Sequence, residues 1–140
     1  MKPTVISFDC YGTLIDWQSG ILAYFRGLAS AHAIAITDEV ILAAYSEFEP
    51  AIQSGLYRSY REVLREVVIR FSERFGFYPS KTELDGLSES LPSWQPFGDT
   101  VEALRALKQQ YKLAIVSNID NDLFQATARS LEVPFDWIIT

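Results

Sequence analysis

The chain has one cysteine, Cys10, and one histidine, His32, among its 140 residues. A single cysteine excludes an internal disulfide and a cysteine-based metal site, which fits a reducing compartment such as the cytoplasm. No histidine lies near Cys10 in the sequence, so a small buried apolar residue explains this position better than a nucleophilic thiol does. His32 is expected in a loop between helices, and nothing pairs it with a nucleophile.

Basic residues are few and scattered, with 12 Lys and Arg against 18 Asp and Glu and a formal net charge of −6. Without a basic cluster that could neutralise phosphates, nucleic acid is a poor partner. No apolar run approaches the roughly 18 residues of a membrane span. The first apolar stretch is interrupted by Asp9 before a signal-peptide core could form. We therefore expect a cytoplasmic protein without a membrane or nucleic-acid partner.

The most informative segment covers residues 5–16, in which an apolar strand is followed by a carboxylate and then by a turn at a glycine. The run from Val5 to Phe8 predicts a strand buried on both faces. A carboxylate at the carboxyl end of such a strand lies where open α/β sheets bind their ligands. Gly12 allows a sharp turn, and Thr13 offers a hydroxyl and an amide to an oxyanion. The residues favour Asp9 as a nucleophile.

A long helical insertion separates this strand from the next one. Its helices are expected at 17–30, from 38 to a kink or end at Pro50, from about 59 to 75, and at 81–90. Two prolines at 92 and 96 predict an extended, non-helical return. Asp99 and Glu102 then predict the start of a helix that ends near residue 111.

The remaining elements are a strand at 112–117, a helix at 121–131 and a strand that ends at Thr140. Together with the first strand they predict a parallel sheet with helices covering both faces, and they place Asp9 and Ser117 on neighbouring strand ends. The predicted fold class is α/β, with a Rossmann-like core formed by residues 1–16 and 95–140. Residues 17–94 form an inserted helical domain.

Two segments carry a resemblance to a known family. The run from Asp9 to Leu14 after an apolar strand resembles the first motif of the haloacid dehalogenase superfamily, most closely that of the type II 2-haloacid dehalogenases. The apolar strand that ends in Ser117-Asn118 resembles the second motif. Superfamily phosphatases usually carry a second Asp two residues after the nucleophile, where this chain has Tyr11. The resemblance implies a core with an inserted helical cap, and the Tyr argues against phosphate-ester hydrolysis.

The same resemblance implies a reaction, hydrolysis of a 2-halo carboxylic acid through an ester at Asp9, with no metal or cofactor. Thr13 and Ser117 would hold the substrate carboxylate or Asp9 itself, and Asn118 would assist departure of the halide. Tyr11 is a further candidate for substrate binding, and Trp17 would form an apolar wall. Family dehalogenases bind the substrate carboxylate with an early cap arginine, for which Arg58 and Arg61 are the nearest replacements here.

The resemblance also implies a Lys and an acidic segment after the third strand, which cannot be assigned in this chain. We therefore expect a family member truncated after its third core strand. Two alternatives stay open: a phosphatase that uses Mg²⁺, and a catalytically incomplete module for binding or assembly. The first strand would lie at a sheet edge, to be covered by further strands, by a partner chain or by a second copy in a homodimer.

Overall fold

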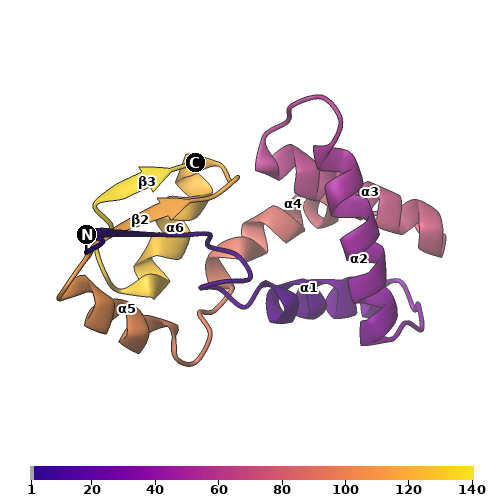
Figure 1. The fold of residues 1–140 in the computed structure, drawn as a ribbon. Coiled ribbons are helices and arrows are strands. Elements are labelled where there is room, and N and C mark those ends of the chain that lie inside the picture. Colours follow the sequence, from indigo (N-terminus) through magenta and orange to yellow (C-terminus); the bar gives the residue numbers. More distant parts are fainter. Residues whose placement is uncertain (1) are drawn as a thin grey trace. The chain divides into compact units, whose positions relative to one another are not determined.

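The computed structural model describes residues 2–140 and divides the chain into two compact units (Figure 1). The core unit comprises the residues up to Trp17 together with Pro92–Thr140, and the helical unit comprises Gln18–Leu91. Each unit has its own buried apolar residues. The interpretation of the helical unit as a cap over the core stays a prediction.

The core unit contains a three-stranded parallel sheet, which confirms the α/β fold class. Its strands are β1 (Val5–Phe8), β2 (Lys112–Val116) and β3 (Trp137–Ile139), in the order β1-β2-β3. Helix α5 (Thr100–Lys108) precedes β2, and helix α6 (Asn121–Leu131) precedes β3. Phe8 pairs with Ile115, so the carboxyl ends of β1 and β2 meet at the same edge of the sheet.

Within residues 2–140 the prediction that helices cover both faces of this sheet is wrong. Leu113 and Ile115 on one face are fully buried, whereas Val116 on the other face is 49% exposed. Val5, Trp137 and Ile139 share the face of Val116 and are exposed as well. The strands follow one another in a single direction, and right-handed crossovers then place both connecting helices on the same face. For the same reason β1 is not buried on both faces.

The return into the core unit differs from the sequence-based expectation at its first residues. A short 3₁₀ turn, η1 (Leu91–Ser93), replaces an extended start of the linker, because proline fits the first turn of a helix. Asp99 stands at the N-cap of α5 but makes no side-chain capping bond. Instead the buried Thr100 hydroxyl donates to the carbonyl oxygen of Leu14 at 2.9 Å. A tertiary hydrogen bond therefore holds the start of α5.

The helices of the helical unit are α1 (Trp17–Ala31), α2 (Asp38–Gln53), α3 (Tyr60–Phe75) and α4 (Lys81–Ser90). The first residue of α1, Trp17, still belongs to the first segment of the core unit. Thr37 caps α2 with its side chain, and Ser59 and Ser80 form capping boxes with Glu62 and Glu83. Helix α3 ends at Gly76, whose φ of 75° is the left-handed conformation that glycine adopts easily.

Pro50 lies inside α2, which continues to Gln53. Proline removes one backbone donor, and here the loss falls in the last turn of the helix. The amide of Ser54, four residues after Pro50, donates to the Pro50 carbonyl at 3.0 Å, and the Ser54 hydroxyl donates to the Ala51 carbonyl at 2.8 Å. These bonds close the helix end in spite of the proline.

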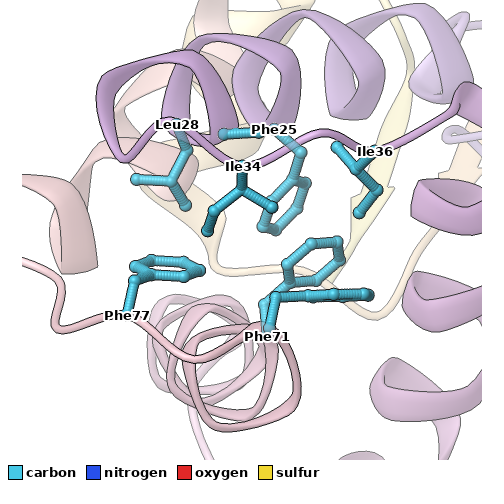
Figure 2. Close-up of a pocket in the computed structure, with 8 residues that line it drawn as sticks. Phe25, Leu28, Ile34, Ile36, Phe71 and Phe77 are labelled. Carbon is cyan, nitrogen blue, oxygen red and sulfur yellow. The ribbon is translucent and has the colours of Figure 1, made fainter.

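Aromatic residues form the core of the helical unit. Phe71 stacks on Phe25 at a centroid distance of 4.2 Å and also contacts Phe48 and Phe75. Beside them lies an apolar crevice (Figure 2). Its empty space totals about 190 Å³, but this space is too narrow at every point to hold a water molecule. Its lining comes from α1, the α1–α2 loop, α3 and the segment after α3: Phe25, Leu28, Ala29, Ile34, Ile36, Phe71, Phe75 and Phe77. Among the helices of residues 2–140, none is long and apolar enough to cross a membrane.

Candidate active site

Asp9 is the first residue after β1, and its side chain is exposed at the edge where the strands end. The chain then turns tightly: the amides of Leu14 and Ile15 both donate to the Cys10 carbonyl, at 2.7 and 3.1 Å. This turn brings the Thr13 hydroxyl to 3.4 Å from Asp9 Oδ2, a long hydrogen bond. A carboxylate and a hydroxyl donor thus lie together at the end of β1.

Gly12 makes this turn possible in two ways. Its φ of 92° lies in a region that residues with a side chain rarely adopt. A Cβ atom at this position would also stand 3.0 Å from Nε1 and 3.1 Å from Cδ1 of Trp17. Trp17 therefore lies directly against the turn that carries Asp9, where an indole can form part of an apolar wall.

Ser117 and Asn118 follow β2 at the same edge of the sheet. Because Phe8 pairs with Ile115, the residues just beyond the two strands are neighbours across the sheet. Ser117 is 8% exposed, and its amide donates to the Ile139 carbonyl at 3.0 Å. Asn118 is exposed. The sequence-derived candidates Asp9, Ser117 and Asn118 thus share one sheet edge.

Cys10 is adjacent to Asp9 but is fully buried. Burial, with a smaller contribution from the charge of Asp9, raises the pKa of the Cys10 thiol to about 12. The sulfur is therefore protonated near neutral pH, and a thiol is a weak nucleophile compared with a thiolate. These properties fit the structural role expected for this residue.

The side chain of Tyr11 has a hydrogen-bond partner that the sequence did not predict. Its hydroxyl lies 2.8 Å from the Thr127 hydroxyl of α6, and its ring meets Trp94 edge-to-face at 6.2 Å. Sequence reasoning missed both Thr127 and Trp94. The available signal was the polar Thr127 between Leu123 and Leu131 at a helical spacing of four residues, on the buried side of α6.

The two arginine candidates belong to the helical unit. Arg58 precedes α3, is exposed and lies 3.9 Å from Glu66. Arg61 is exposed in the first turn of α3. Their assignment to substrate binding stays a prediction, as does that of Tyr11 and Trp17.

Residues 2–140 bring together no group of three or more His, Cys, Asp or Glu side chains that could hold a metal ion. The donors at the end of β1 are one carboxylate with hydroxyl and amide groups. A single carboxylate in this position can act directly as a nucleophile.

Comparison with known proteins connects this geometry to a family. The family model for haloacid dehalogenase-like hydrolases matches residues 3–140. Two similar solved structures are the L-2-haloacid dehalogenase from Xanthobacter autotrophicus, with 25% identity and a TM-score of 0.80, and the defluorinating L-2-haloacid dehalogenase Rha0230, with 28% identity and a TM-score of 0.78. No curated protein matches the chain.

These alignments cover 99% of this chain but only 57% and 60% of the two neighbours. A third neighbour, the L-2-haloacid dehalogenase PA0810, is 23% identical with a TM-score of 0.77, and 61% of it is covered. The chain therefore spans about three fifths of the length of these structures.

Proposed function

Since the chain belongs to the haloacid dehalogenase-like hydrolase family, we propose that it hydrolyses the carbon–halogen bond of 2-halo carboxylic acids with Asp9 as the nucleophile. The observation that carries this proposal is the position of Asp9, exposed at the end of β1 and within reach of the Thr13 hydroxyl. Two neighbours with 25% and 28% identity are L-2-haloacid dehalogenases, and the Xanthobacter enzyme has been solved with chloropropionic acid covalently bound.

The proposed reaction has two steps. A carboxylate oxygen of Asp9 attacks the halogen-bearing carbon, the carbon–halogen bond breaks, and halide leaves with its electron pair. The product is an ester between Asp9 and the 2-hydroxy acid. Water then attacks the Asp9 carbonyl carbon, the ester bond breaks, and the alcohol takes up a proton while one proton is released. The sum is halo acid plus water to hydroxy acid, halide and a proton.

The other residues at this sheet edge have roles that follow from their donors. The Thr13 hydroxyl orients the Asp9 carboxylate through their hydrogen bond, and Ser117 holds the substrate carboxylate. The Asn118 amide donates to the departing halide. Trp17 provides an apolar wall beside the turn. Tyr11, Arg58 and Arg61 remain proposed substrate contacts, the two arginines as donors to the carboxylate.

No step of the proposed reaction passes through a metal ion. The competing phosphatase would need Mg²⁺ and a general acid, and Tyr11 stands where superfamily phosphatases usually carry that acid. We further propose a cytoplasmic location, on the basis of the single cysteine.

The test is halide release from 2-chloropropionate, measured with and without added Mg²⁺, together with mass spectrometry of the rapidly quenched protein. We expect release without Mg²⁺ and an adduct on Asp9. Asp9→Asn should lower the rate at least about a thousandfold, which is about 4 kcal/mol of transition-state stabilisation. Asp99→Asn removes another exposed core carboxylate and should leave the rate unchanged.

Each alternative has its own outcome. Phosphate release from p-nitrophenyl phosphate that requires Mg²⁺, with no halide release, would replace the proposal by a phosphatase. Absence of both activities in a folded protein would favour a module for binding or assembly. Full halide release by Asp9→Asn, without deamidation back to Asp, would refute the nucleophile.

A further inference from the structure

Thr127 is a polar residue in a place where apolar residues are expected. It is 1% exposed and lies on the buried side of α6 between Leu123 and Leu131. Burying a hydroxyl without a partner costs free energy, so a buried threonine in an apolar row needs hydrogen bonds. Thr127 has two: one to the hydroxyl of Tyr11 at 2.8 Å and a longer one to the Leu123 carbonyl at 3.4 Å.

The direction of these bonds follows from the number of protons. A carbonyl oxygen accepts only, so in the second bond Thr127 is the donor and its single hydroxyl proton points to Leu123. Thr127 then accepts from Tyr11 in the first bond, and each hydroxyl proton has an acceptor. In this arrangement the phenol proton of Tyr11 is directed to α6.

Tyr11 connects α6 to the turn that carries Asp9. Its ring is also fixed edge-to-face by Trp94, which is 4% exposed. Its backbone bridges to Ile15, whose carbonyl accepts from the Gly12 amide at 2.9 Å. Asp9 lies two residues before Tyr11, and Thr127 lies 116 residues after it. The Tyr11–Thr127 bond is therefore a side-chain connection between the nucleophile turn and a distant helix.

We propose that Thr127 is a positioning residue that acts through Tyr11. Its hydroxyl accepts the phenol proton of Tyr11 and fixes the turn of residues 9–16 against α6. The fixed turn holds the Asp9 carboxylate at the end of β1 in position for attack. The second part of the proposal, which concerns the reactivity of Asp9, rests on the proposed function. The first part, the anchored turn, does not.

The experiment compares Thr127→Val, which keeps the shape and removes the hydroxyl, with Thr127→Ser, which keeps the hydroxyl. Thr82→Val on the exposed side of α4 is the matched control. Hydrogen exchange of residues 9–16, followed by mass spectrometry, measures the anchor without any substrate. We expect faster exchange of this segment in Thr127→Val, and wild-type exchange in Thr127→Ser and Thr82→Val.

Kinetics with 2-chloropropionate then test the effect on Asp9. We expect Thr127→Val to lower kcat about tenfold or more, with KM changed less than about twofold, and Thr127→Ser to restore kcat. Adding Thr127→Val to Tyr11→Phe should cause no further loss, because both changes remove the same bond. Tyr11→Phe also tests the bond from the other side if Thr127→Val does not fold.

The outcomes separate the two proposals. Faster exchange in Thr127→Val together with no halide release by the wild type would support the anchored turn and refute the proposed reaction. Normal exchange in Thr127→Val and Tyr11→Phe, or independent losses of kcat in the double variant, would overturn the positioning role. A loss of thermal stability with unchanged kcat would show that Thr127 serves only packing.

Discussion

The two units hold their helices in different ways. In the helical unit α2, α3 and α4 all begin at a side-chain cap, supplied by Thr37, Ser59 and Ser80. In the core unit α5 and α6 begin at Asp99 and Asp120, and neither makes a side-chain capping bond to its helix. The core unit instead contains hydrogen bonds between residues that lie far apart in the sequence.

Four such bonds hold the core unit together. The Thr100 hydroxyl bonds the Leu14 carbonyl at 2.9 Å, and the Tyr11 and Thr127 hydroxyls meet at 2.8 Å. Asp136 accepts from the Leu113 amide at 2.8 Å and from Lys108 at 2.6 Å. The comparison teaches that the starts of α2, α3 and α4 are fixed by neighbours in sequence, whereas the start of α5 is held by a residue far away in the chain.

The largest expected effect is in the aromatic core of the helical unit. Phe71→Ala should lower the free energy of unfolding by about 3–5 kcal/mol, because it removes a ring that contacts three other Phe residues. Urea denaturation measures the change. Tyr78→Ala, at a side chain that is 97% exposed, is the control and should be nearly neutral. A loss below about 1 kcal/mol for Phe71→Ala would contradict a tightly packed core.

Replacing a glycine by alanine should change the free energy of unfolding in opposite directions in the two units. Gly12→Ala in the core unit should cost about 1–3 kcal/mol, because its φ is 92° and the new Cβ would meet Trp17. Gly27→Ala in α1 meets no atom within 4 Å and should stabilise by about 0.5–1 kcal/mol. Thermal or urea unfolding of both variants tests the pair. Equal changes in the free energy of unfolding for the two variants would mean that the turn at Gly12 adjusts to the new side chain without cost.

Removal of the helix caps tests the comparison directly. Ser80→Ala should cost about 1 kcal/mol, since it opens the capping box of α4. Asp99→Ala at the equivalent position of α5 should cost less than about 0.5 kcal/mol, because it breaks no capping bond. Urea unfolding curves of the two variants provide the numbers. A larger loss for Asp99→Ala than for Ser80→Ala would reverse the distinction between the units.

The smallest effects concern acid pH. The backbone amide of Ser80 and the side chain of His32 lower the pKa of Glu83, and Lys108 and the Leu113 amide lower that of Asp136. A lowered pKa in the folded state adds stability above the carboxyl's unfolded pKa, and this stability is lost as the pH falls through the folded value.

Glu83→Gln and Asp136→Asn keep the hydrogen-bonding oxygen and remove the charge, so each should flatten the acid limb of stability below the unfolded pKa of the carboxyl. Denaturation at several pH values and two salt concentrations measures this limb. The Asp136 contribution should fall more with salt, because the bond to Lys108 is its largest cause. An unchanged acid limb in both variants would refute the linkage.

Much of the fold could be predicted from the sequence because the signals are local. The capping box at Ser80 and Glu83, the stop at Gly76 and the strand at Val5–Phe8 are each set by a few neighbouring residues. A prediction failed where distant residues decide, on the open face of the sheet. Thr127 escaped notice for the same reason, since its partner Tyr11 lies 116 residues away.

The sequence by itself determined the starts of α2, α3 and α4, the end of α3 at Gly76, the position of Asp9 after an apolar strand and the two motifs that resemble haloacid dehalogenases. These depend on backbone preferences and hydrogen bonds within a few residues. Only the tertiary structure decided which sheet face is exposed, that Gly12 must leave room for Trp17, and that the Tyr11 hydroxyl turns to Thr127. Such contacts join distant segments, and their geometry exists only once the sheet and its helices have packed.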